Sequence, residues 1–139
     1  MIQFTNERTD LPELNEGMVR AWIRKVAAWQ GKTAGDITFM FCDDEKILEV
    51  NQQYLQHDYY TDIITFDYST GSVISGDLVI SVDTVATNSI QFNTNFEQEL
   101  HRVIIHGVLH LCGYDDGTPE LRAAMTQLEN EALQLFYTL

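Results

Sequence analysis

The spacing of hydrophobic residues changes along the chain and predicts strands mostly in its first half and helices mostly in its second. Strands are expected where apolar residues alternate with less apolar ones, or where β-branched and aromatic residues concentrate. These segments are Ile2–Thr5, Asp36–Asp44, Thr61–Tyr68 and Gly76–Thr84. Apolar residues recur instead at helical spacing in Asn15–Trp29 and Glu45–Leu55.

The pattern becomes helical after the last predicted strand. Asn95 is suited to cap a long apolar helix that Gly113 ends. Thr118 followed by Pro119 predicts the start of a final helix that continues to about Phe136. Strands that mostly precede helices favour a layered α+β domain in which a small sheet is covered by helices.

Composition is consistent with one globular domain over residues 1–139. The chain is 45% hydrophobic and shows no repeat, low-complexity run or linker. No stretch approaches the roughly 20 apolar residues of a membrane helix, so we expect a cytoplasmic protein with no membrane partner. Cys42 and Cys112 belong to no CxxC pair and are expected to be buried free thiols.

The net negative charge of this chain limits how it can bind a polyanion such as nucleic acid. Its formal net charge is −13, so its average field repels nucleic acid, and any such contact must be local. Three of the eight basic residues, Arg20, Arg24 and Lys25, lie on one predicted helix. They form either a solvated helix surface or a phosphate-binding patch.

The stretch HGVLHLCGYDDG, residues 106–117, carries the candidate chemistry. His106 and His110 are four residues apart and project side by side from a helix, as the two histidines of zincin helices do when they bind one zinc ion. Core histidines satisfied by hydrogen bonds are the alternative. The chain can reverse at Gly113, so Asp115 or Asp116 is the candidate third ligand. Three protein ligands leave an open position, as in catalytic zinc sites.

Gly107 lies inside this predicted helix, where glycine costs roughly 1 kcal/mol relative to alanine. The cost suggests that something approaches the backbone closely there. Either a substrate or a packed strand would satisfy this requirement.

The motif resembles the signature HGxLHLxGYDH of the YbeY family, the metal-dependent endoribonucleases also called rRNA maturation factors. Two upstream segments, Thr61–Phe66 and Gly76–Ser81, are similar to the TDVLSF and GDIVIS stretches of that family and occur in the same order. The similarity extends from about Phe39 to Leu133.

The resemblance implies an α+β fold with a small mixed sheet, which we expect to have about four strands and about five helices. It also implies one zinc ion at the motif helix and hydrolysis of single-stranded RNA. In that family the activity serves maturation of ribosomal RNA, including the 3′ end of the small-subunit species, and quality control of ribosomes. The implied partners are rRNA and the small ribosomal subunit, and the oligomeric state stays open.

Carried over by position, His106 and His110 take the places of the first two metal ligands. Asp116 takes the place of the third, which is a histidine in the family pattern. Two histidines and one carboxylate form an established catalytic zinc set, although the carboxylate makes the ion a weaker Lewis acid. Iron, manganese or nickel also become plausible occupants, with zinc preferred.

A second departure lies at Leu55, where family members commonly have an arginine that contacts phosphate. Another cation must then balance the transition-state charge. Arg102, one turn before His106, is the candidate, with a surface pair to Glu99 or Gln98 as the alternative. His57 is a weaker candidate for RNA contact.

An electropositive groove for RNA is expected to combine the metal with Arg102 and with Arg20 and Arg24 of the earlier helix. The general base is Asp115, solvent at the metal, or the RNA 2′-hydroxyl.

Other functions remain to be separated from this one. A peptidase with an HExxH motif needs a glutamate where this chain has Gly107, which counts against a zinc peptidase. A non-enzymatic ribosome-assembly factor with a structural metal is the main alternative. Another zinc hydrolase and an iron oxygenase are further alternatives.

Overall fold

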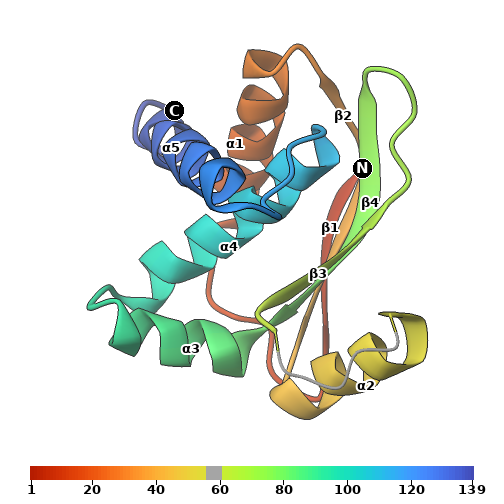
Figure 1. The fold of residues 1–139 in the computed structure, drawn as a ribbon, viewed down its shortest axis with the longest axis vertical. Helices are drawn as coiled ribbons and strands as arrows, with labels where there is room; N and C mark the ends of the chain where they lie inside the picture. Colours follow the sequence, from red (N-terminus) through yellow and green to blue (C-terminus); the bar gives the residue numbers. More distant parts are fainter. Residues whose placement is uncertain (56–60) are drawn as a thin grey trace.

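The computed structural model describes residues 1–55 and 61–139, and in that part of the chain helices cover both faces of a four-stranded sheet (Figure 1). The strands are β1 (Ile2–Glu7), β2 (Thr33–Cys42), β3 (Ile63–Asp67) and β4 (Val73–Ser81). The helices are α1 (Glu16–Trp29), α2 (Asp44–Leu55), α3 (Val82–Gln91), α4 (Phe96–Leu111) and α5 (Pro119–Phe136).

The sheet has the order β1-β2-β4-β3 and is mixed. β1 pairs with β2 and β2 with β4 in parallel, whereas β3 pairs antiparallel with β4 at the sheet edge. The α+β prediction of one domain with about four strands and about five helices is therefore confirmed for the described residues. β1 and β3 form opposite edges of the sheet, which matters for the placement of the basic residues.

The two faces of the sheet are covered unequally. Successive residues of β4 point to opposite faces, so Leu78 and Ile80 join the large core under α1, α4 and α5, while Val79 joins a small core under α2. α4 is the central helix and is buried along most of its length between the sheet and α5 (Figure 1). Among the described helices, none is long and apolar enough to cross a membrane.

β4 ends earlier than the predicted strand Gly76–Thr84. The Ser81 hydroxyl accepts a hydrogen bond from the backbone N–H of Thr84 and so caps α3. The Asp44 carboxylate then accepts hydrogen bonds from the Ser81 and Thr84 hydroxyls, both at 2.6 Å. This network, which joins the starts of α2 and α3, outweighs the strand preference of the β-branched residues that follow Ser81.

Both cysteines are free thiols, as predicted. Cys42 is buried, whereas Cys112 is only half-buried, which differs from the expectation. Burial raises the pKa of the Cys42 thiol to about 12 and that of Cys112 to about 11. Both side chains are therefore protonated at neutral pH and are weak metal ligands.

Candidate metal centre

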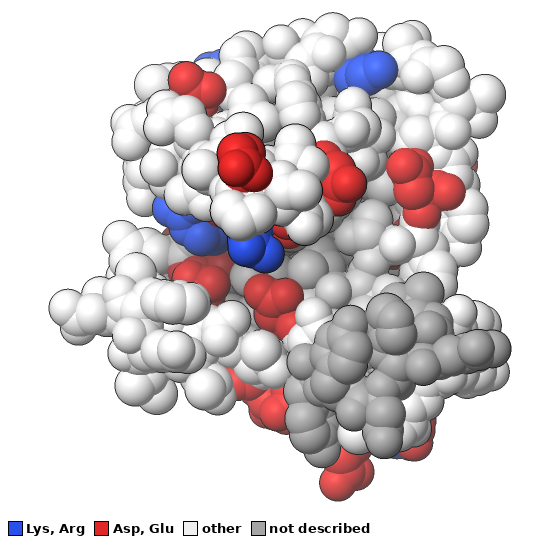
Figure 2. Space-filling view, in the orientation of Figure 1, with Lys and Arg blue, Asp and Glu red and all other residues white. Residues whose placement is uncertain are grey.

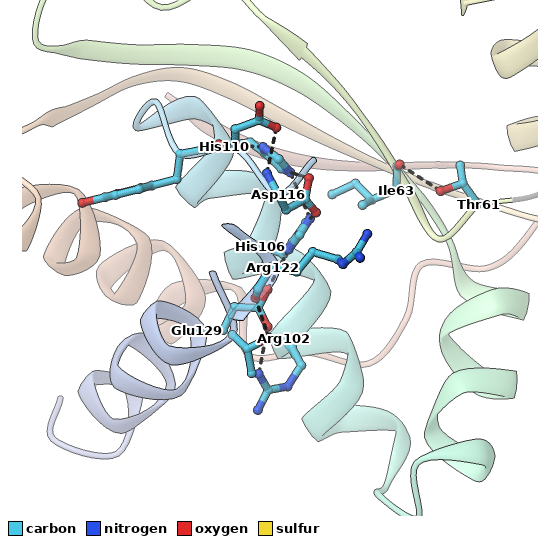
Figure 3. A network of polar contacts seen from close by, with 11 residues as sticks. Thr61, Ile63, Arg102, His106, His110, Asp116, Arg122 and Glu129 are labelled. Atoms are coloured by element: carbon cyan, nitrogen blue, oxygen red, sulfur yellow. Dashed lines mark hydrogen bonds and ion pairs between the residues drawn. The ribbon is translucent and has the colours of Figure 1, made fainter. Parts of the chain in front are cut away.

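The two histidines project from the C-terminal half of α4, as the spacing predicts. The Asn95 side chain and Gln98 form a capping box that fixes the start of this helix. Its end is set by Gly113, whose φ of +107° is a conformation that favours glycine. The chain reverses there and returns Asp116 to the side of the helix that carries His106 and His110 (Figure 3).

The three side chains converge closely enough to hold one ion. The Nε2 atoms of His106 and His110 lie 3.0 Å apart. Asp116 places Oδ2 3.3 Å from the first and Oδ1 3.6 Å from the second. A tetrahedral zinc ion with bonds of about 2.0–2.1 Å requires its ligand atoms to be about 3.3–3.4 Å apart. The observed separations bracket that value, so the cluster fits such an ion.

Hydrogen bonds at the other ring nitrogens turn both Nε2 atoms toward the centre of the cluster. His106 Nδ1 lies 2.7 Å from Glu129 Oε2, and His110 Nδ1 lies 2.9 Å from the carbonyl oxygen of Tyr114. Both partners are acceptors, so each Nδ1 carries the proton in the neutral ring and each Nε2 keeps its lone pair free. This orientation leaves both Nε2 atoms able to hold a metal ion together with Asp116.

Glu129 is a site residue that sequence reasoning did not find. It comes from the middle of α5, its side chain is 8% exposed, and its Oε1 accepts a hydrogen bond from Arg102 Nη1 at 2.8 Å. Arg102 Nη2 donates to the side-chain oxygen of Asn130 at 2.8 Å. The hydrogen-bonding partners of Arg102 are therefore on α5, and Glu99 interacts with it only through its charge.

The surrounding carboxylates raise the pKa of His106. Burial lowers its pKa, but the hydrogen bond to Glu129 and the negative charges of Glu129, Asp116 and Asp62 outweigh burial, so the pKa is raised. Protons therefore compete with a metal ion for this imidazole more strongly than for an isolated histidine.

The cluster opens into a cavity of about 480 Å³ between α4 and the strand β3. His106, His110 and Asp116 line one side, and Thr61 to Thr65 line the other. A smaller cavity of about 230 Å³ continues from the cluster along α4 toward Glu99 and Arg102. Figure 2 shows charged side chains of both signs beside a hollow on this face of the molecule.

Asp62 lines both of these cavities together with His106 and Asp116. Burial raises the pKa of its carboxyl group, although the charge of His106 opposes that shift. Asp62 was part of a motif in the sequence, but no chemical role was assigned to it. Its position next to the cluster makes it a functional candidate.

Gly107 is explained by packing against the sheet. A Cβ at this position would lie 2.7 Å from Ile63 Cδ1 and would also overlap the Leu78 side chain. α4 therefore crosses the sheet with its backbone at Gly107 packed directly on the Ile63 side chain of β3 and the Leu78 side chain of β4. Of the two alternatives left open by the sequence, the packed strand is the correct one, and this contact places the cluster beside β3.

The structure does not bring the remaining candidates to the cluster. Asp115 is exposed, accepts a hydrogen bond from the backbone N–H of Asp116 at 2.7 Å, and lines neither cavity. Arg20 and Arg24 line a different cavity with β1, at the opposite sheet edge from β3. The prediction that they share one groove with Arg102 was therefore wrong. His57 lies outside the described residues.

Arg20 also has partners that occupy its guanidinium group. Its Nε donates to the carbonyl oxygen of Ile2 at 2.9 Å, and its Nη2 contacts Glu16 at 3.1 Å. The group lies 5.1 Å from the centre of the Phe4 ring. These contacts hold the Arg20 side chain at the β1 edge of the sheet. Arg24, one turn later on the same helix face, lines the same cavity.

Known proteins share the sequence pattern over almost the whole chain. The family model described as Endoribonuclease YbeY matches residues 2–137. The protein of Parabacteroides distasonis with that name is 57% identical, over 96% of this chain and 94% of its own length. Its namesake from Phocaeicola vulgatus is 56% identical, over 97% of this chain and 98% of its own.

A solved structure supports the fold independently. The solution structure of a Thermotoga maritima protein matches with a TM-score of 0.67 and covers 99% of this chain and 90% of its own. It is 24% identical in sequence, so this likeness concerns the fold alone. The family match and the curated relatives go further, and they show that this chain belongs to the YbeY endoribonuclease family.

Proposed function

We propose that residues 1–139 form one metal-dependent endoribonuclease domain that cuts single-stranded RNA in the cytoplasm. Its biological substrate is ribosomal RNA, including the 3′ end of the small-subunit species, and it also acts in ribosome quality control. Family membership supports the reaction class. The observation that carries the proposal is the convergence of His106, His110 and Asp116, whose ligand atoms all lie within 4.8 Å of one another.

The cofactor in this proposal is one zinc ion held by His106, His110 and Asp116. Two imidazole nitrogens and one carboxylate oxygen also suit other divalent transition metals. When bound, such an ion would supply water activation and stabilisation of negative charge on a phosphate oxygen. The cavity next to the cluster is lined by β3 on its far side and is where the RNA would bind in this proposal.

The residues of this chain have separate roles in the proposal. Glu129 and the Tyr114 carbonyl hold the two imidazoles in the orientation that exposes Nε2. Arg102 holds Glu129 by a charge-assisted hydrogen bond. Asp62, which lines the cavity where Asp115 does not, is the carboxylate we assign to proton transfer during hydrolysis. The attacking nucleophile in this proposal is water, and the RNA 2′-hydroxyl is the alternative nucleophile.

The test measures cleavage of one labelled RNA sequence, first as a single strand and then in a duplex. The zinc-loaded wild-type chain should cut the single-stranded RNA and spare the same sequence in a duplex. His110→Ala should lose more than about 100-fold in rate, because it removes a proposed ligand, whereas outer-shell changes typically cost 10–100-fold. His101→Leu on the same helix should cut normally and serves as the matched control.

The alternative of a non-enzymatic ribosome-assembly factor is favoured by one observation, Leu55 in place of the family arginine. If wild type and His110→Ala both leave the RNA intact and both bind the small ribosomal subunit, the nuclease proposal fails and this alternative replaces it.

A further inference from the structure

An RNA phosphate that enters the cavity meets mostly negative charge. Asp62, Asp67 and Asp116 line the larger cavity, and Glu99 and Glu129 line its smaller continuation. A phosphodiester is itself an anion and gains more negative charge in the transition state of hydrolysis. The site therefore needs a cation from the protein in addition to the proposed metal.

The arginine nearest to the ligands along α4 is already engaged. Arg102 donates to Glu129 and to Asn130, both at 2.8 Å. If a phosphate took its guanidinium group, the buried Glu129 would lose this partner and His106 would lose a firmly held acceptor. Arg102 therefore serves as a positioning residue, and the contact with phosphate requires a different side chain.

Arg122 has a suitable place on α5. Residues 122, 125 and 129 recur at a spacing of three and four, so Arg122 shares a helix face with Met125 and Glu129, both of which are buried against the rest of the molecule. It lies in the first turns of α5, directly after the reversal that carries Asp116. Figure 3 shows the Arg122 side chain beside His106 and Asp116, extending toward the side on which Ile63 lies.

Arg122 also keeps its hydrogen-bonding capacity. Its side chain is exposed and has no hydrogen-bond or ion-pair partner among residues 1–55 and 61–139. By contrast, Arg8, Arg20 and Arg102 each pair with a glutamate. Arg24 shares this lack of a partner in the described part of the chain, but it lies at the β1 edge of the sheet. Within the described part of the chain, Arg122 therefore offers an unpaired guanidinium group that lies beside His106 and Asp116, outside the lining of the two cavities (Figure 3).

We propose that Arg122 binds the scissile phosphate of the RNA through its guanidinium group and stabilises the negative charge that develops there. A planar guanidinium group matches two phosphate oxygens at once. The residue replaces, from a different helix, the arginine that this chain lacks at Leu55. The inference rests on the proposed endoribonuclease function and assigns a substrate-contacting residue within it.

The experiment measures kcat, RNA affinity and zinc affinity for wild type, Arg122→Gln, Arg122→Lys and Arg24→Gln. Arg122→Gln should lower kcat by about 100-fold, the typical cost of removing one transition-state donor. Arg122→Lys should recover part of that loss, because lysine keeps the positive charge but cannot donate to two phosphate oxygens from one planar group. Zinc affinity should stay within twofold in all variants, and Arg24→Gln should behave as wild type.

Two further readouts separate phosphate contact from a structural role. Added guanidinium ion at millimolar concentration should restore part of the activity of Arg122→Ala. The slope of log affinity for single-stranded RNA against log salt is negative, and its magnitude should decrease by about 0.7 in Arg122→Gln, as expected for one lost phosphate contact.

The possible outcomes separate failure of the Arg122 assignment from failure of the endoribonuclease proposal. If wild type leaves RNA intact, the endoribonuclease proposal fails and the assignment of Arg122 fails with it. If wild type cuts RNA and Arg122→Gln cuts it equally fast with an unchanged salt slope, only the assignment of Arg122 is overturned.

Discussion

His101 and His106 lie on the same helix, less than two turns apart, and have opposite surroundings. His101 is 6% exposed and packs against aromatic rings, with its ring centre 5.6 Å from that of Trp22 and 4.6 Å from that of Phe136. His106 contacts the carboxylates of Glu129 and Asp116 and lines a cavity. Burial lowers the pKa of His101, whereas the neighbouring carboxylates raise that of His106.

This difference shows that helical position alone does not make a histidine a ligand. One face of α4 meets α1 and the end of α5, where apolar and aromatic groups fill the space. The face that carries His106 meets the middle of α5 and the reversal after Gly113, and these supply a carboxylate on each side of the ring. The partners that other elements bring therefore decide which histidine can bind a metal.

The largest effect should come from removing a ligand. His110→Ala deletes one of the two Nε2 donors, and we expect zinc affinity to fall by more than about 100-fold. His101→Leu should leave zinc affinity unchanged, because its ring lies in the aromatic core. Competition titration against a zinc chelator measures both. Equal losses in the two variants would remove the distinction between the two histidines.

A smaller loss is expected when the orientation of His106 is disturbed. Glu129→Gln keeps the shape of the side chain but removes the charge that holds His106 Nδ1 and Arg102. Zinc affinity should fall by about 10-fold, the lower end of the range for partners of metal ligands. Glu131→Gln, an exposed change on the same helix, is the matched control. An unchanged affinity in Glu129→Gln would refute the positioning role.

Packing at Gly107 should affect stability rather than ligand chemistry directly. Gly107→Ala places a methyl group against Ile63 and into overlap with Leu78, so we expect the upper end of the overpacking range, a cost of about 3 kcal/mol. A gain in helix propensity of about 1 kcal/mol offsets part of that cost. Gly117→Ala is the control, since its new methyl group meets only the Asp115 carboxylate, at 3.7 Å. Denaturant unfolding measures the free energy of unfolding of both variants, and equal values would contradict this account.

The smallest effect is in pH dependence and should have opposite sign at the two histidines. His101 has a lowered pKa in the folded chain, so its contribution reduces stability as pH falls below the unfolded value of about 6.5. His106 has a raised pKa, so its contribution is fully present below about pH 6.5 and is lost as pH rises through the folded value. NMR titration of both rings in the metal-free chain checks the two directions.

The main elements and the pairing of His106 with His110 could be predicted from the sequence because both follow from local spacing, whereas the choice of Asp116 over Asp115 came from the family resemblance. His106 and His110 share a helix face, and Gly113 indicates the reversal that returns Asp116. Glu129 and Arg122 could not be found in this way, since both come from α5 and reach the site only through its packing against α4. The available signal in the sequence for Glu129 was an acidic residue at a position on the apolar side of an amphipathic helix.

The basic residues illustrate the same limit from the other direction. Arg20 and Arg24 share a helix face, which was foreseen, but the sheet order that places β1 opposite β3 is a property of the whole fold. Spacing within α1 carries no information about that order. Gly107 was recognised as a close approach, yet only the packing of α4 on Ile63 and Leu78 identifies the neighbour.

The central claim, that Asp116 completes a metal site with His106 and His110, is tested most directly by zinc titration of the metal-free chain and of Asp116→Ala. Calorimetry of wild type should give one zinc ion per chain, and Asp116→Ala should lose more than about 100-fold in affinity, since it removes a ligand rather than an outer-shell partner. Asp115→Ala, the neighbouring exposed carboxylate, should match wild type. Equal zinc affinity in Asp116→Ala and wild type would contradict the ligand set.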